Sequence, residues 1–72
     1  MSSEHKKIAL ERINEAFKNP TWYNIDDIKY LSMLNLTQQE IDEIMDVVRE
    51  RLHKYSMMNI ELHKALYKAK LL

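Results

Sequence analysis

Glycine and cysteine are absent from the chain, and proline occurs once, at position 20. Without glycine, the sequence lacks the residue that tight hairpin turns and phosphate-binding loops require, so β-hairpins and nucleotide-binding loops are not expected. Without cysteine there can be no disulfide, no cysteine-based zinc knuckle and no cysteine nucleophile. The simplest expectation is a helical fold that is not held by covalent cross-links.

Long apolar runs are absent as well. No segment approaches the roughly 20 consecutive apolar residues that a membrane-spanning helix needs, and the N-terminal segment MSSEHKKIALER lacks the apolar core of a signal peptide. We therefore expect a cytoplasmic protein that does not act at membranes. The 11 basic and 11 acidic side chains give a net charge of zero, so bulk electrostatic attraction to nucleic acid is not expected either.

The composition is that of a small globular protein. Hydrophobic residues make up 46% and charged residues 31% of the 72 residues, a mixture typical of folded rather than disordered chains. One helical domain spanning residues 1–72 is all that this length allows. A chain of this size buries only about 60% of its extended surface, so self-association is the expected additional source of stability.

Apolar residues recur at helical spacing, which predicts an all-α fold, a small bundle of three or four helices. The first helix should run to about Lys18 and stop at Asn19-Pro20, because the residue before proline is pushed out of the helical region. Asn24 is then the expected N-cap of a second helix that runs to about Leu34. The residues expected on the inner faces of these two helices are Ala9, Ile13, Ala16, Phe17, Ile25, Ile28, Leu31 and Leu34.

A long third helix is predicted from about Gln38. Thr37 and Glu40 have the spacing of a capping box, in which each side chain accepts a hydrogen bond from the backbone N–H of the other residue. The apolar positions that follow keep the helical period. These positions are Ile41, Ile44, Met45, Val48, Leu52 and Tyr55.

The sequence leaves open where this third helix ends. Neither glycine nor proline interrupts residues 38–72, so one helix of about 50 Å is one possibility at a rise of 1.5 Å per residue, and its far end would need a partner. The other possibility is a break between Ser56 and Asn59, followed by a fourth helix near residues 60–70. In both cases the apolar surface along residues 41–69 is expected to exceed what one short chain can cover.

No catalytic or cofactor-binding pattern is recognisable in the sequence. Glu50 and His53 have the i, i+3 spacing of half a di-iron site, but the second copy of the motif that such a site needs is missing. We therefore expect no metal ion, no cofactor and no enzymatic activity.

The predicted function is that of a small non-enzymatic regulatory or adaptor protein, of the inhibitor or modulator type, that binds another protein and forms a homodimer. The helical stripe is expected to supply most of the binding energy, and charges around it are expected to set the orientation. Trp22 and Tyr23 are a second candidate surface. The residues of the first candidate surface are Met45, Leu52, Tyr55, Met58 and Leu62.

Two alternatives remain at the level of sequence. Lys64, Lys68 and Lys70 form a basic strip, through which the chain would act as a DNA- or nucleoid-associated transcription modulator. Binding dominated by phosphate contacts would weaken steeply as salt is raised. Separately, the acidic ridge of Glu43, Asp46 and Glu50 is either a docking face or the ordinary solvent face of an amphipathic helix.

Overall fold

The computed structural model describes residues 2–55 and 59–72, with side chains from residue 4 onward. As predicted, the fold is all-α: the described residues form four α-helices and one short 3₁₀ helix, and contain no strand. The third helix ends well before the C-terminus and a separate fourth helix follows, which decides between the two alternatives. The elements are α1 (Ser2–Lys18), α2 (Trp22–Lys29), η1 (Tyr30–Met33), α3 (Gln38–Lys54) and α4 (Ile60–Lys68).

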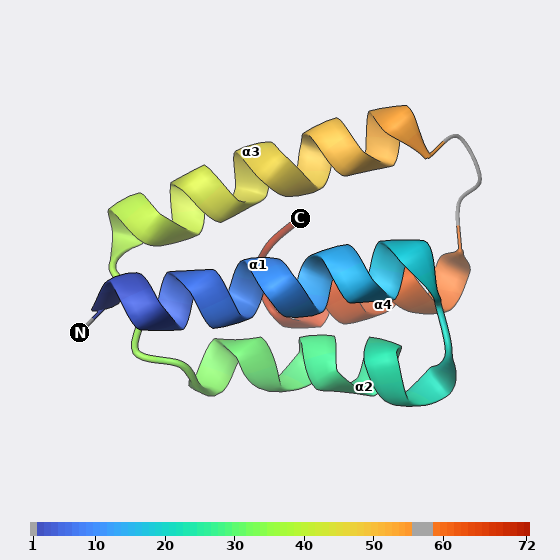
Figure 1. Cartoon of the computed structure of the whole chain (residues 1–72), viewed down its shortest axis with the longest axis horizontal. Helices are drawn as coiled ribbons and strands as arrows, with labels where there is room; N and C mark the ends of the chain where they lie inside the picture. The colour runs from blue at the N-terminus through green and yellow to red at the C-terminus, as the bar shows by residue number, and fades with distance from the viewer. Residues whose placement is uncertain (1, 56–58) are drawn as a thin grey trace.

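The helices form a compact bundle in which α1 and α2 each pack against two other helices. α2 packs against both α1 and α4, and α1 also packs against α3. In Figure 1, α1 and α3 run in one direction, whereas α2 and α4 run in the opposite direction, so α2 and α4 begin at the same end of the molecule. The bundle measures 33 × 22 × 17 Å.

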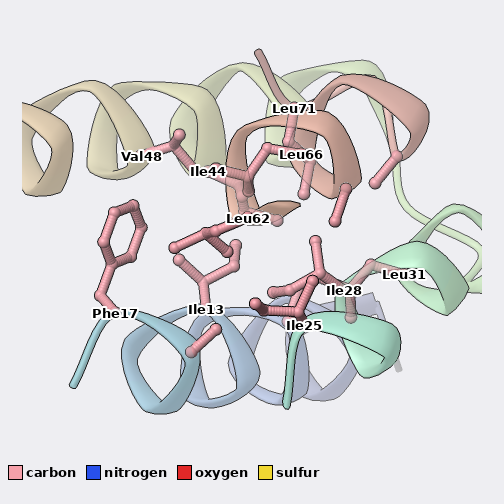
Figure 2. Close-up of a cluster of buried hydrophobic side chains, with 14 residues drawn as sticks. Ile13, Phe17, Ile25, Ile28, Leu31, Ile44, Val48, Leu62, Leu66 and Leu71 are labelled. Carbon is pink, nitrogen blue, oxygen red and sulfur yellow. The ribbon is translucent and has the colours of Figure 1, made fainter. Parts of the chain in front are cut away.

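One hydrophobic core joins all four helices. Figure 2 shows Ile13 and Phe17 of α1 facing the side chains of α3 and α4, with Ile28 of α2 closing the cluster beside them. All of the inner residues expected in the first two helices belong to this core or pack against its edge. The buried members are Ala9, Ile13, Ala16, Phe17, Ile25, Ile28, Leu31, Ile44, Val48, Leu62, Ala65, Leu66, Ala69 and Leu71.

The second helix begins earlier than the sequence suggested. Thr21, not Asn24, is the N-cap: its side-chain oxygen accepts a hydrogen bond from the backbone N–H of Asn24 at 3.4 Å. The side chain of Asn24 instead donates to the backbone carbonyl of Asn19 at 2.8 Å. The prediction of Asn24 as the cap is therefore wrong, because this residue holds the preceding turn after α1 has ended.

The same helix also ends differently from the prediction, since α2 stops at Lys29 and continues as the 3₁₀ helix η1. A 3₁₀ turn has three residues per turn instead of 3.6. Leu31 remains buried within it, while Leu34 is extended and donates its N–H to the Leu31 carbonyl at 3.1 Å. The tighter turn thus keeps an apolar side chain in the core as the chain leaves the helix.

The start of α3 confirms the predicted capping box. The Thr37 hydroxyl accepts a hydrogen bond from the Glu40 N–H at 3.1 Å, and the Glu40 carboxylate accepts one from the Thr37 N–H at 2.9 Å. Glu40 is nearly buried, and this bond satisfies its carboxylate. The two bonds pair backbone donors that would otherwise have no partner at the first turn of the helix.

Replacing Thr37 with alanine should lower the free energy of unfolding by about 1 kcal/mol, the usual effect of losing a threonine N-cap. Thr21→Ala is the matched control, because Thr21 makes one longer capping bond and has no reciprocal partner. We expect the control to have the smaller effect when both variants are unfolded in urea. Equal losses would show that the shorter bond from the Glu40 N–H makes Thr37 no better a cap than Thr21.

The end of α4 is closed by a Schellman motif. Lys70 lies in the left-handed region with φ 61°, and its N–H donates to the Tyr67 carbonyl at 3.0 Å. The Leu71 N–H donates to the Leu66 carbonyl at 2.9 Å, and the side chains of Leu66 and Leu71 both lie in the core. This pairing of hydrogen bonds with an apolar contact is characteristic of the motif, and it directs Leu71 inward.

Candidate protein-binding surfaces

Of the residues predicted for the first binding surface, one is buried and three are half-buried within the single chain. Leu62 is only 5% exposed and belongs to the core, so its assignment to an accessible surface is wrong. Leu52 and Tyr55 are half-buried and pack against the core, where the Tyr55 ring stacks on Phe17 with centroids 5.8 Å apart. Met45 is half-buried, and Met58 lies outside the described residues.

Leu62 is buried because of the direction that the chain takes after α3. Because α4 packs against α2 instead of extending α3, its apolar side turns inward and contributes Leu62, Ala65 and Leu66 to the core. The expectation that one chain could not cover the apolar residues along 41–69 is therefore wrong for the apolar residues that α3 and α4 bury. Ile44 and Val48 of α3 are fully buried in the same way.

The exposed apolar side chains gather instead on α2 and η1. Trp22 and Tyr23, the second predicted surface, are 78% and 51% exposed, and their rings meet edge to face with centroids 5.7 Å apart. Tyr30 and Met33 of η1 are also largely exposed. The sequence prediction missed these two residues, although they stand two and five residues after the buried Ile28, which is off the face of the helix that Ile28 occupies.

The exposed residues of this segment fall on two flanks of α2. Trp22, Asp26 and Lys29 lie on the flank toward α4, where they line a hollow of about 410 Å³ with Asn59 and Glu61. Asn24 and Asp27 lie on the flank toward α1. Each flank combines apolar and charged side chains.

A groove between α1 and α2, named here the Ile8 groove, is lined by Ile8, Glu11, Glu15, Tyr30, Leu34 and the Arg12–Asp27 ion pair. It consists of two adjoining hollows of about 330 and 270 Å³ that share Ile8, Arg12 and Asp27. The Arg12 guanidinium and the Asp27 carboxylate are 3.0 Å apart and join the two helices across it. The apolar side chains of Ile8, Tyr30 and Leu34 meet at one end of the groove.

The charge of the Ile8 groove is negative. Arg12 and Asp27 neutralise each other, whereas Glu11 and Glu15 are exposed and make no ion pair with any residue that the structure describes. These two carboxylates are one helical turn apart on α1, at i and i+4. The groove therefore presents an apolar end beside two unneutralised acidic side chains.

The acidic ridge on α3 is partly used within the chain. The Lys6 ammonium of α1 forms an ion pair with Glu43, and the hydrogen bond it donates, together with its charge, holds the pKa of the Glu43 carboxyl below its ordinary value. Asp46 pairs with Arg49 on its own helix at 3.0 Å, and Glu50 is exposed. Glu43 thus links α1 to α3, and only Asp46 and Glu50 resemble a plain solvent-facing surface.

The lysines of the alternative nucleic-acid surface are exposed. Lys64 and Lys68 lie one turn apart on α4, and Lys70 follows the end of the helix in the left-handed conformation. Glu61 lies one turn before Lys64 on the same helix. The strip is therefore short, and an acidic side chain adjoins it.

The described part of the chain contains no cluster of metal-binding side chains and no helix that could cross a membrane. No group of three or more histidine, cysteine, aspartate or glutamate side chains is placed so that it could hold a metal ion. None of the helices found there is both long enough and apolar enough to cross a membrane.

Comparison of the chain with protein-family models, with curated proteins and with solved structures found no match.

Proposed function

We propose that the chain is a small non-enzymatic regulatory or adaptor protein that acts by binding another protein in the Ile8 groove. The observation that supports this most is the combination of exposed apolar side chains with unneutralised carboxylates along one groove. Exposed apolar surface framed by polar groups is typical of protein-binding sites. This combination is less typical of the ordinary solvent face of a helix, which carries charged and polar side chains without exposed apolar ones.

The charge of the groove defines the chemistry of the partner. Because Arg12 already pairs with Asp27, a ligand does not need to neutralise either of them. Glu11 and Glu15 remain available, so a ligand with two basic side chains would gain two ion pairs at the groove. Charged pairs of this kind fix orientation and speed association more than they raise affinity.

The shape of the groove favours a helical segment as the ligand. α1 and α2 run alongside each other (Figure 1), and the groove follows the line between them. An amphipathic helix can place apolar residues against Ile8, Tyr30 and Leu34 and basic residues one turn apart against Glu11 and Glu15. We therefore propose a basic amphipathic helix of another protein as the partner.

A titration with a designed peptide tests this proposal. The peptide is an amphipathic helix of leucine and lysine, roughly 15 residues long so that it can form a helix, and its control is a scrambled peptide of the same composition without an apolar stripe. NMR amide shifts should change first around Ile8 and Tyr30 with the amphipathic peptide. Equal shifts with the scrambled peptide, or shifts centred on another helix, would contradict the proposal.

A pair of double variants tests the acidic side chains. Glu11→Lys with Glu15→Lys should weaken peptide binding at least about tenfold, because two attractions become repulsions. Asp46→Lys with Glu50→Lys is the matched control, since it makes the same change in net charge at the same spacing on α3. If both double variants weaken binding equally, the attraction is a property of the net charge and not of the groove.

A separate experiment tests the alternative function, which is DNA-associated modulation through Lys64, Lys68 and Lys70. Its signature is binding to duplex DNA that falls steeply with salt concentration and is lost in the double variant Lys64→Glu with Lys68→Glu. That result, combined with no peptide binding in the groove, would replace the protein-binding proposal.

A further inference from the structure

The two hollows of the Ile8 groove differ in chemistry. They share Ile8 and the Arg12–Asp27 ion pair. Beyond these shared residues, the hollow of about 330 Å³ is lined only by polar side chains, those of Glu11, Glu15 and Asn24. The hollow of about 270 Å³ is lined only by apolar and aromatic side chains, those of Tyr30, Leu31 and Leu34. The groove therefore has a polar end and an apolar end, with the ion pair between them.

The two ends are separated along the axes of the helices. α1 and α2 run antiparallel (Figure 1), so the start of α1 lies beside the end of α2. On the α1 side, Glu15 lies seven positions after Ile8. On the α2 side, Tyr30 lies six positions after Asn24. At a rise of 1.5 Å per residue, either interval is about 10 Å, or two helical turns.

The polar end offers hydrogen-bond acceptors to a ligand. The carboxylates of Glu11 and Glu15 are exposed and make no ion pair with a residue that the structure describes. The Asn24 amide nitrogen already donates to the Asn19 carbonyl at 2.8 Å, so the oxygen of that amide is the atom it offers to a ligand. Ammonium and guanidinium groups carry donors and no acceptor. Basic side chains are therefore the groups that fit this end.

The apolar end does not suit a charged side chain. Tyr30 is 58% and Ile8 38% exposed, and Leu34 is half-buried beside them. The charged residues that line this hollow, Arg12 and Asp27, neutralise each other at 3.0 Å. A basic side chain placed here would lose its hydration without gaining a partner, whereas an apolar one would gain contacts.

We propose that the groove selects a helix whose apolar and basic residues are separated along its length, and that it fixes which end of this helix lies where. Two apolar residues one turn apart occupy the end formed by Tyr30 and Leu34. Two basic residues, each about seven positions further along the ligand, pair with Glu11 and Glu15. This inference rests on the proposed function, because it concerns the ligand of the same groove.

The order of residues along the ligand distinguishes it from other basic amphipathic helices. Positions i, i+4, i+7 and i+11 share one face of a helix, so a single stripe makes all four contacts. When apolar and basic residues alternate along that stripe, one basic residue falls at the apolar end and one apolar residue at the polar end. Each mismatch leaves a charge without its partner, which is how an interface rejects a wrong ligand.

Two peptides of equal composition test this selection. Both are helices of alanine and glutamine, roughly 15 residues long, with two leucines and two lysines at positions i, i+4, i+7 and i+11. The segregated peptide has the order Leu, Leu, Lys, Lys, and the interleaved peptide has the order Leu, Lys, Leu, Lys. NMR titrations should show at least about tenfold tighter binding of the segregated peptide. Circular dichroism of the free peptides corrects for any difference in their helix content.

A nitroxide label on either end of the segregated peptide tests its orientation. A label beside the lysines should broaden the amide signals around Glu15 and Asn24 most. A label beside the leucines should broaden those around Tyr30 and Leu34 most. If both labels broaden both ends of the groove equally, the ligand has no fixed orientation and the inference is wrong.

The substitution Tyr30→Glu tests the apolar end. It supplies an acceptor where the interleaved peptide places a lysine, so most of the preference for the segregated peptide should be lost. Tyr23→Glu is the matched control, because Tyr23 is 51% exposed on the same helix and lines neither hollow. The control should leave the ratio of the two affinities within about twofold. An equal loss of preference in both variants would assign it to net charge and overturn the inference.

The inference and the proposed function fail in different ways. If both peptides bind in the groove with equal affinity, the inference is wrong and the proposed function stands. If neither peptide shifts the amide signals around Ile8 and Tyr30, the proposed function is wrong, and the inference with it.

Discussion

Replacing Leu71 with alanine should lower the free energy of unfolding by about 2–5 kcal/mol, the usual range for removing a fully buried leucine side chain. Leu71 is only 2% exposed, although it is the second-to-last residue of the sequence. The Schellman motif holds it there through its backbone bond to Leu66. A domain of this length has a total stability of roughly 4–11 kcal/mol, so this one substitution would remove a large part of it.

Leu72→Ala is the control for this prediction. It removes the same side chain from the adjacent position, where leucine is half-buried at the edge of the core. Urea unfolding of both variants, followed by circular dichroism, should show a clearly larger loss for Leu71→Ala. Equal losses would mean that the end of the chain does not dock into the core in solution.

The substitution Ile28→Ala should have an effect of similar size, about 2–5 kcal/mol. Ile28 is completely buried and lies on α2, the helix that packs against both α1 and α4. Figure 2 shows its side chain within the cluster, beside Ile25 and Leu31. Removing three carbon atoms there leaves a cavity that both neighbouring helices would have to close.

Ile60→Ala is the matched control, because Ile60 is 66% exposed at the start of α4. The same chemical change should there alter stability by no more than about 0.5 kcal/mol. Thermal unfolding of the two variants at one protein concentration checks the difference. If Ile60→Ala proves as destabilising as Ile28→Ala, the packing of α4 against the rest of the bundle differs from the one described.

The sequence predicts best those features that are encoded within a few neighbouring residues. The start of α3 follows from Thr37 and Glu40 alone, because the capping box is a local hydrogen-bonding pattern. The start of α2 cannot be predicted from its neighbouring residues in the same way, because Thr21 and Asn24 are both good N-cap residues and lie three positions apart. In the structure the Asn24 side chain donates its hydrogen bond to the Asn19 carbonyl, and Thr21 caps the helix.

Features that depend on how helices pack were less predictable. Helical periodicity correctly placed Leu62 on an apolar stripe, but it does not tell whether that stripe meets the same chain or another one. The packing of α4 against α2 decides this. The Ile8 groove escaped prediction for a related reason, because it requires the Arg12–Asp27 contact between two helices, and no spacing within either helix reveals that contact.

The separation of the two flanks of α2 has a consequence for assigning the effects of substitutions. Trp22, Asp26 and Lys29 line a different hollow from the Ile8 groove, so a change on one flank leaves the lining of the other intact. A loss of peptide binding after a change at Glu11 and Glu15 can therefore be assigned to the groove.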